Sequence, residues 1–70
     1  MGKETEFKRA RTLILNEGER VNYEGTDWLY LHKMGGAVTR AVALLERHRK
    51  LVRWSKKTPN LVRLVGQSKI

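Results

Sequence analysis

The 70-residue sequence contains no cysteine, one proline and no apolar run near the roughly 18 residues that a membrane-spanning helix needs. The absence of cysteine excludes disulfides and thiolate metal sites. Residues 1–6 lack the apolar core of a secretory signal, so we expect a cytoplasmic protein with no membrane partner. The length fits a single domain, residues 1–70, in which residues 66–70 form a frayed tail.

Acidic side chains are scarce in the second part of the chain. Residues 1–27 contain five basic and six acidic side chains, whereas residues 28–70 contain ten basic side chains and one acidic side chain, Glu46. The formal net charge of +8 therefore arises from residues 28–70. An excess of one sign on one segment favours a polyanionic partner, either nucleic acid or an acidic protein surface.

The sequence also offers little material for catalysis or metal binding. The two histidines, His32 and His48, have neither H-E-x-x-H spacing nor a cysteine partner. Ser55 and Ser68 lack a nearby base with an orienting group. We therefore expect a binding protein and not an enzyme, with no cofactor and no metal ion.

The first half of the chain predicts a helix followed by an ambiguous segment. Residues 4–17 carry a helical apolar stripe, and Gly18 is well placed to end that helix. Residues 20–34 fit either a hairpin that turns at residues 24–27 or a short helix over residues 28–34. We favour the hairpin, because four consecutive bulky apolar residues would wrap most of a two-turn helix.

Residues 36–50 predict an amphipathic helix. Arg40, Ala43 and Arg47 fall together on its polar face, so a small side chain stands among cations and allows close approach to another surface. From Leu51 onward the apolar period changes from about 3.6 to about 2, which ends the helix at Lys50. The face expected to pack in the core consists of Val38, Ala41, Val42 and Leu45.

Residues 51–65 predict a second hairpin, with its tip at residues 56–60. We expect Arg53 and Arg63 to share its outer face. Trp54 fits the core better than it fits base stacking, and the same holds for the possible RNA platform of Tyr23, Trp28 and Tyr30. The core face of this hairpin is expected to consist of Val52, Trp54, Val62 and Leu64.

Residues 37–46 read Ala-Val-Thr-Arg-Ala-Val-Ala-Leu-Leu-Glu, and residues 51–53 read Leu-Val-Arg. This pattern resembles the winged helix-turn-helix superfamily, in which a recognition helix leads into a wing. The resemblance covers about half of the chain, and the usual Leu-Gly-Val-Ser turn before the helix is missing. It implies a winged-helix-like α+β fold of order helix–hairpin–helix–hairpin, or alternatively helix–helix–helix–hairpin.

The resemblance also implies a small transcriptional regulator that binds double-stranded DNA. Arg40 and Arg47 would then read the major groove, and Thr39 would contact a phosphate or a thymine methyl group. Arg9 and Arg11 are secondary phosphate contacts. The side chains expected to neutralise phosphates are Lys50, Arg53, Lys56, Lys57 and Arg63.

Two alternative functions remain open from the sequence. The same basic face suits a small mobile-element protein that binds or inhibits an acidic host protein, and it also suits an RNA-binding accessory factor. With any of these functions the sequence also allows a homodimer, since a core of this size gains from burying more apolar surface. Leu15, Leu29 and Ile70 have no evident place in the core and are the expected dimer contacts.

Overall fold

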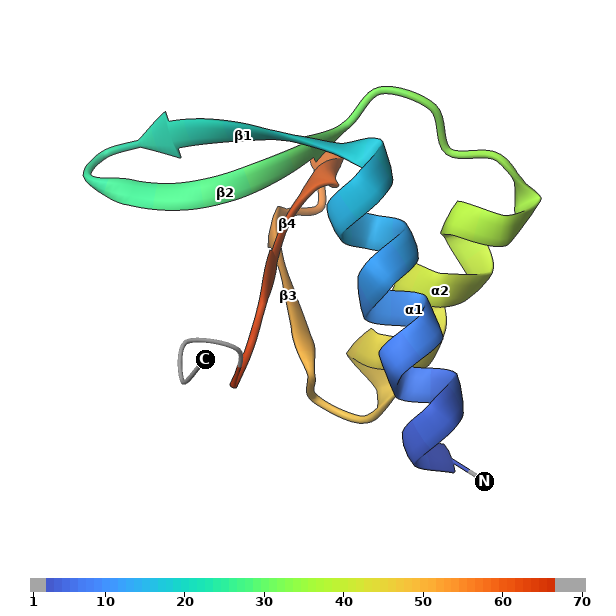
Figure 1. Ribbon diagram of the computed structural model, residues 1–70. Coiled ribbons are helices and arrows are strands. Elements are labelled where there is room, and N and C mark those ends of the chain that lie inside the picture. The colour runs from blue at the N-terminus through green and yellow to red at the C-terminus, as the bar shows by residue number, and fades with distance from the viewer. Residues whose placement is uncertain (1–2, 67–70) are drawn as a thin grey trace.

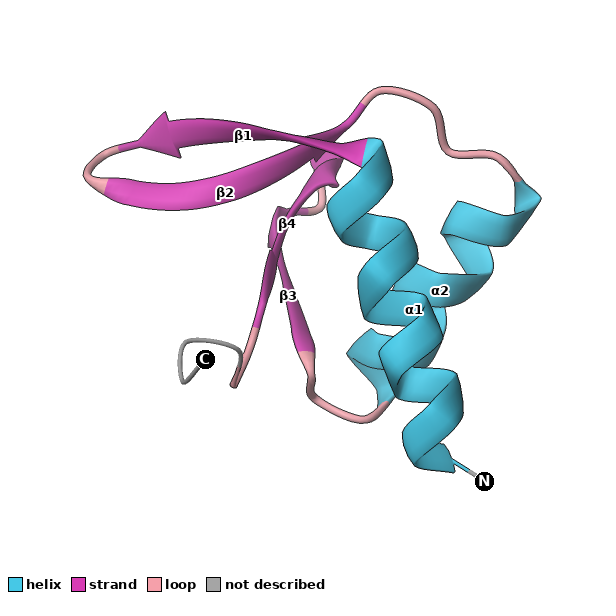
Figure 2. Ribbon diagram, viewed as in Figure 1, coloured by secondary structure: helices cyan, strands magenta, loops and turns pink. Residues whose placement is uncertain are grey.

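Two helices cover one face of a four-stranded antiparallel sheet in the computed structural model, which describes residues 3–66 (Figures 1 and 2). The strand order in the sheet is β1-β2-β4-β3. This confirms the order helix–hairpin–helix–hairpin. Ser68 and Ile70 lie outside the described residues. The elements are α1 (Lys3–Glu17), β1 (Gly18–Tyr23), β2 (Thr26–Leu31), α2 (Gly36–Arg47), β3 (Leu51–Ser55) and β4 (Thr58–Leu64).

Helix α1 ends at Glu17, directly before the predicted stop at Gly18. A Cβ atom at position 18 would lie 2.9 Å from the carbonyl oxygen of Ile14 and 3.0 Å from Cβ of Leu29. Glycine therefore allows the chain to pass from α1 into β1 without a spacer, because any larger residue would collide with backbone. At its other end, Glu4 and Glu6 lie in the first turn, where the helix dipole favours negative charge.

Residues 18–31 form the predicted hairpin, and the alternative helix over residues 28–34 was wrong. Glu24 and Gly25 both have positive φ, 54° and 82°, as a type I′ turn requires. The turn is braced by the Asn22 side chain, which donates to Oδ1 of Asp27 at 3.0 Å and accepts the Gly25 N–H at 3.3 Å. The hairpin projects from the body of the protein beyond the two helices (Figure 1).

The second hairpin turns earlier than predicted. Lys56 and Lys57 form the turn, whereas Pro59 and Asn60 belong to β4. The Ser55 hydroxyl braces this turn, since Oγ accepts the N–H groups of Lys57 and Thr58. The Asn60 side chain connects two strands of the sheet: its Nδ2 donates to the carbonyl oxygen of Leu31 at 3.1 Å. This bond extends the short pairing of β2 with β4.

The faces of β3 are the reverse of those predicted. Val52 pairs with Arg63 and Arg53 pairs with Val62, so the two arginines lie on opposite faces of the sheet. Leu51 is buried against the helices, whereas Val52 and Trp54 are exposed on the other face. Both sets of alternate positions in β3 contain apolar residues, and periodicity alone favoured the wrong set.

The core lies between the helices and the sheet. Leu29 is buried in this core, so it is not the dimer contact that the sequence suggested, whereas Leu15 is exposed. Among residues 3–66 no helix is both long and apolar enough to cross a bilayer. The largest fully buried side chains are Ile14, Leu31, Val42, Leu45 and Val62.

Helix α2 ends at Arg47, three residues before the predicted end. The Lys50 N–H donates to the carbonyl of Leu45 at 2.7 Å, and the Arg49 N–H donates to that of Glu46 at 3.0 Å. These two bonds define a Schellman motif, in which the residue after the C-cap adopts a left-handed conformation. That residue is Arg49, with φ of 59°, at a position that most helices give to glycine.

We expect Arg49→Gly to raise the free energy of unfolding by about 0.5–1 kcal/mol, because the relief of left-handed strain exceeds the larger conformational entropy that glycine loses on folding. Urea unfolding of the purified variant measures the change. Arg47→Gly is the matched control, since the same substitution inside α2 should cost about 1 kcal/mol. Destabilisation by both substitutions to the same extent would contradict the assignment of the motif.

Candidate nucleic-acid interface

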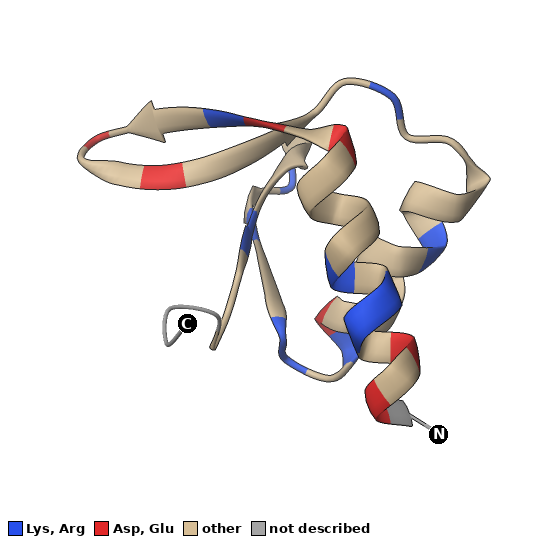
Figure 3. Cartoon of the chain, in the orientation of Figure 1, with Lys and Arg blue, Asp and Glu red and all other residues tan. Residues whose placement is uncertain are grey.

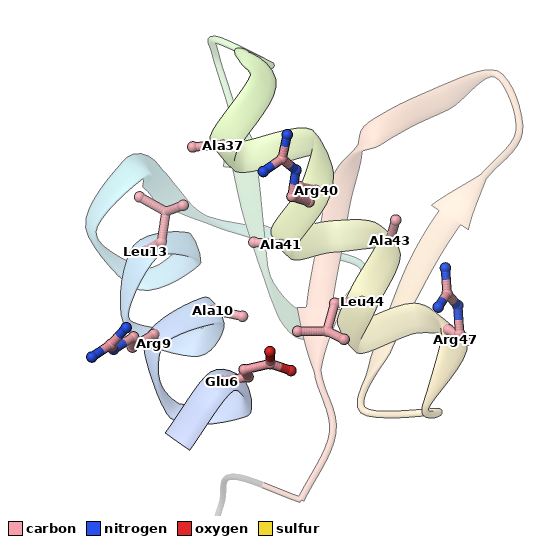
Figure 4. A pocket seen from close by; sticks show the side chains of 10 residues that line it. All are labelled: Glu6, Arg9, Ala10, Leu13, Ala37, Arg40, Ala41, Ala43, Leu44 and Arg47. Carbon is pink, nitrogen blue, oxygen red and sulfur yellow. The ribbon is translucent and has the colours of Figure 1, made fainter. Parts of the chain in front are cut away.

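An open groove of about 470 Å³ runs between the exposed sides of α1 and α2 (Figure 4). Ala10 and Ala41 are buried where the two helices meet, and their small side chains let the helices approach closely. Its rim carries Arg9 and Glu6 from α1 and Arg40 and Arg47 from α2. The remaining lining residues are Leu13, Ala37, Ala43 and Leu44.

Arg40 and Arg47 lie on the same exposed face of α2, as predicted. Seven residues correspond to about 10 Å along a helix axis, which is within the roughly 12 Å width of a DNA major groove. Ala43 is exposed between them. Among residues 3–66, neither arginine takes part in an ion pair, so both guanidinium groups are free to bind a ligand.

Arg9 is the third cation of this surface. It extends from α1 on the other side of the groove from α2 (Figure 4). The sequence identified Arg9 only as a secondary contact, because nothing in its spacing shows that α1 packs beside α2. We refer to Arg9, Arg40 and Arg47 as the basic helical surface. Glu6, on the same rim, is the one acidic side chain that lines the groove.

Charge is unevenly distributed over the fold (Figure 3). Basic residues lie along the two helices, on the segment that joins α2 to β3 and on the second hairpin, whereas most acidic residues lie on the β1–β2 hairpin and at the two ends of α1. An anionic partner is therefore attracted to the helical side of the molecule and repelled by the tip of the first hairpin.

Lys50 follows α2 and contacts α1. Its ammonium group lies 5.0 Å from the centre of the Phe7 ring, which is a cation–π contact between the end of α2 and α1. The Phe7 ring in turn makes an edge contact with His48 at 4.9 Å. These contacts hold the lysine in place without neutralising it, so Lys50 remains able to bind a phosphate.

Arg53 is occupied within the fold. Its Nε donates to both carboxylate oxygens of Glu46, at 3.0 and 3.1 Å, and its Nη1 donates to the carbonyl of Pro59 at 3.2 Å. The ion pair is partly shielded from water, so the guanidinium ties α2 to β4 instead of remaining free. Arg53 is therefore not free to neutralise a phosphate, contrary to what the sequence had suggested.

Arg63 lies away from the basic helical surface. It belongs to the face of the sheet that the helices leave uncovered, and its guanidinium carbon is 5.4 Å from the centre of the Trp28 ring. A ligand bound to α2 is on the other side of the sheet. The structure therefore does not bring Arg63 together with Arg40 and Arg47.

Lys56 and Lys57 are exposed at the β3–β4 turn. Lys56 lines a shallow depression together with Glu46, Val52 and Arg53. Thr39 is exposed near the start of α2, and its hydroxyl donates to the carbonyl of Met34 at 3.2 Å. That hydroxyl stabilises the first turn of α2, while its methyl group remains available for contact.

The histidines have local structural partners. His32 lies 2.6 Å from the Glu19 carboxylate at the exposed base of the first hairpin, and His48 packs on Phe7. Within residues 3–66, no group of three histidine, aspartate or glutamate side chains is arranged to hold a metal ion.

Comparison with protein-family models, with curated proteins and with solved structures finds no match for this chain.

Proposed function

We propose that this protein binds double-stranded DNA through the basic helical surface, as a small transcriptional regulator of winged-helix type. The observation that carries the proposal is that Arg9, Arg40 and Arg47, from two helices, border one open groove, and that none of them forms an ion pair among the described residues. Guanidinium groups bind phosphates and pair with the two acceptors of guanine, so a surface with three of them suits a duplex.

In this proposal α2 enters the major groove. Arg40 and Arg47 contact base edges or flanking phosphates, and the exposed Ala43 between them allows the helix axis to approach the DNA. Arg9 and Lys50 bind the backbone beside the groove. The β3–β4 hairpin serves as the wing, with Lys56 and Lys57 near its tip. The proposal requires a compartment that holds DNA, in agreement with the cytoplasmic location expected from the sequence.

An acidic protein partner is the second candidate, and one observation favours it. The groove between α1 and α2 has an apolar lining of alanine and leucine beneath the arginine rim. An amphipathic acidic helix would place apolar side chains in the groove and carboxylates on the arginines. A DNA phosphate would meet only the rim.

The proposal is tested by titrating the protein into labelled duplex DNA, single-stranded RNA and an acidic amphipathic peptide, with fluorescence anisotropy as the readout. With three to five phosphate contacts, duplex affinity should fall between about 40-fold and about 500-fold when salt is raised from about 50 mM to about 200 mM. Absence of duplex binding at the lower salt rejects the proposal. Binding of the peptide in its place supports the second candidate.

A further inference from the structure

Within residues 3–66, no element packs on the face of the sheet opposite the helices (Figure 1), and this face is rich in aromatic residues. Strand alternation places Tyr23, Trp28, Tyr30 and Trp54 on it, because these residues have the opposite orientation to the buried Leu29, Leu31 and Val62. We call this surface the outer sheet face. Its other members within the paired strands are Glu19, Val21, Thr26, Val52, Leu61 and Arg63. Trp28 and Leu61 are themselves buried beneath their neighbours.

The aromatic side chains of the outer sheet face support one another. The Trp54 ring meets the Tyr23 ring at 4.6 Å and the Trp28 ring at 5.2 Å, both edge to face. Arg63 covers the Trp28 ring. Rings that are already held in place lose little conformational entropy when a partner binds, so this cluster is preorganised for contact.

Exposed apolar area is concentrated on the outer sheet face. Five large apolar side chains are exposed among residues 3–66, and three of them lie there: Tyr23 (45%), Val52 (40%) and Trp54 (36%); a fourth, Val65 (42%), directly follows β4. The fifth, Leu15, lies on α1. A patch of exposed apolar side chains is typical of an interaction surface, whereas single exposed apolar residues are common on any protein.

The charge of this face distinguishes between partners. Its strand residues include one carboxylate, Glu19, which is bound to His32, and one exposed guanidinium, Arg63, so their formal charges cancel while His32 is neutral. A single-stranded nucleic acid needs a row of cations along the stacked rings, and this face has one. A copy of a chain with net charge +8 is repelled by every strongly basic surface, and the outer sheet face lets two copies meet without that repulsion.

We propose that the outer sheet face is the contact between two copies of this chain, packed sheet to sheet. Residues at the centre of such an interface are aromatic and uncharged, as they are here. A two-fold arrangement brings the same patch of each copy together. The helices of both copies then remain outside, with the two basic helical surfaces directed away from each other. The contact does not depend on DNA binding.

Sedimentation equilibrium without nucleic acid, from about 10 µM to about 1 mM protein, tests the proposal. The apparent mass should rise from 8.2 kDa toward twice that value, and the association should persist in high salt, which weakens DNA binding. Trp54 is exposed on this face, whereas Trp28 is already buried, so the emission of Trp54 should shift to shorter wavelength as the dimer forms. A constant monomeric mass over this range overturns the proposal.

Tyr23→Lys/Val52→Lys should weaken the association about 100-fold, because four like charges then meet in the interface. Both positions are exposed, and circular dichroism confirms that the variant folds. Thr12→Lys/Leu15→Lys adds the same charge on the exposed side of α1 and should leave association unchanged. Equal weakening by the two variants contradicts a sheet-to-sheet dimer. So does a protein that stays monomeric and whose tryptophan emission is quenched by oligothymidylate, a result that would assign the face to single-stranded nucleic acid.

Discussion

Replacing Arg40 and Arg47 together with alanine is expected to weaken duplex DNA binding about 100-fold, because each arginine that contacts a base edge or a phosphate contributes about 1–3 kcal/mol. Both side chains are exposed and free of carboxylate partners within residues 3–66, so their loss leaves no buried charge unpaired. The fold should therefore persist. Fluorescence anisotropy at low salt measures the loss of affinity.

The matched control is Arg20→Ala/Lys33→Ala. It removes the same charge from exposed positions on β1 and on the loop before α2, outside the groove. Its effect on duplex affinity should be several-fold at most, through general electrostatic attraction. If the two double variants lose affinity equally, total charge and not the basic helical surface determines binding.

Leu45→Ala should lower the free energy of unfolding by about 3 kcal/mol, because Leu45 is fully buried between α2 and the sheet and its loss leaves a cavity. A 70-residue domain has about 4–10 kcal/mol of stability in total, so the variant should be close to unfolding at body temperature. Urea unfolding followed by circular dichroism measures the difference.

Leu15→Ala serves as the control for that substitution. It makes the same chemical change in the other helix, at a position that is 42% exposed, and should cost about 0.5 kcal/mol or less. Equal losses at positions 15 and 45 would mean that the core does not lie between α2 and the sheet.

The order of the elements could be predicted because local chemistry marks their ends. Gly18 stops the first helix where no Cβ fits, and Glu24–Gly25 supplies the two positive φ angles that a tight hairpin needs. The change of period at Leu51 marks the start of β3. Each of these signals acts within a few residues, so no knowledge of tertiary packing was needed.

The orientation of β3 could not be predicted, because it depends on contacts made far along the chain. Arg53 has a place on the helix side only because Glu46 and the carbonyl of Pro59 are there to receive it. Val52 and Trp54 look like core residues in the sequence, yet the helices lie on the other side of the sheet. Because both faces of β3 carry apolar residues, the alternation of apolar residues in the sequence did not determine which face packs in the core.

The candidate site was predicted in part for a similar reason. The exposed face of α2 follows from helical geometry, so Arg40, Ala43 and Arg47 could be grouped from the sequence alone. The groove beside it depends on how α1 packs, and that is decided by the small side chains at positions 10 and 41. The place of Arg9 therefore became visible only in the folded protein.

The most direct test of the basic helical surface is the slope of log affinity against log salt concentration for duplex DNA, compared between the wild-type protein and Arg40→Ala/Arg47→Ala. If both arginines neutralise phosphates, the slope of the variant should be shallower by about 1.8, since each contact contributes about 0.9. Identical slopes for the two proteins would show that neither arginine displaces counterions from DNA, and that this face of α2 is not the contact.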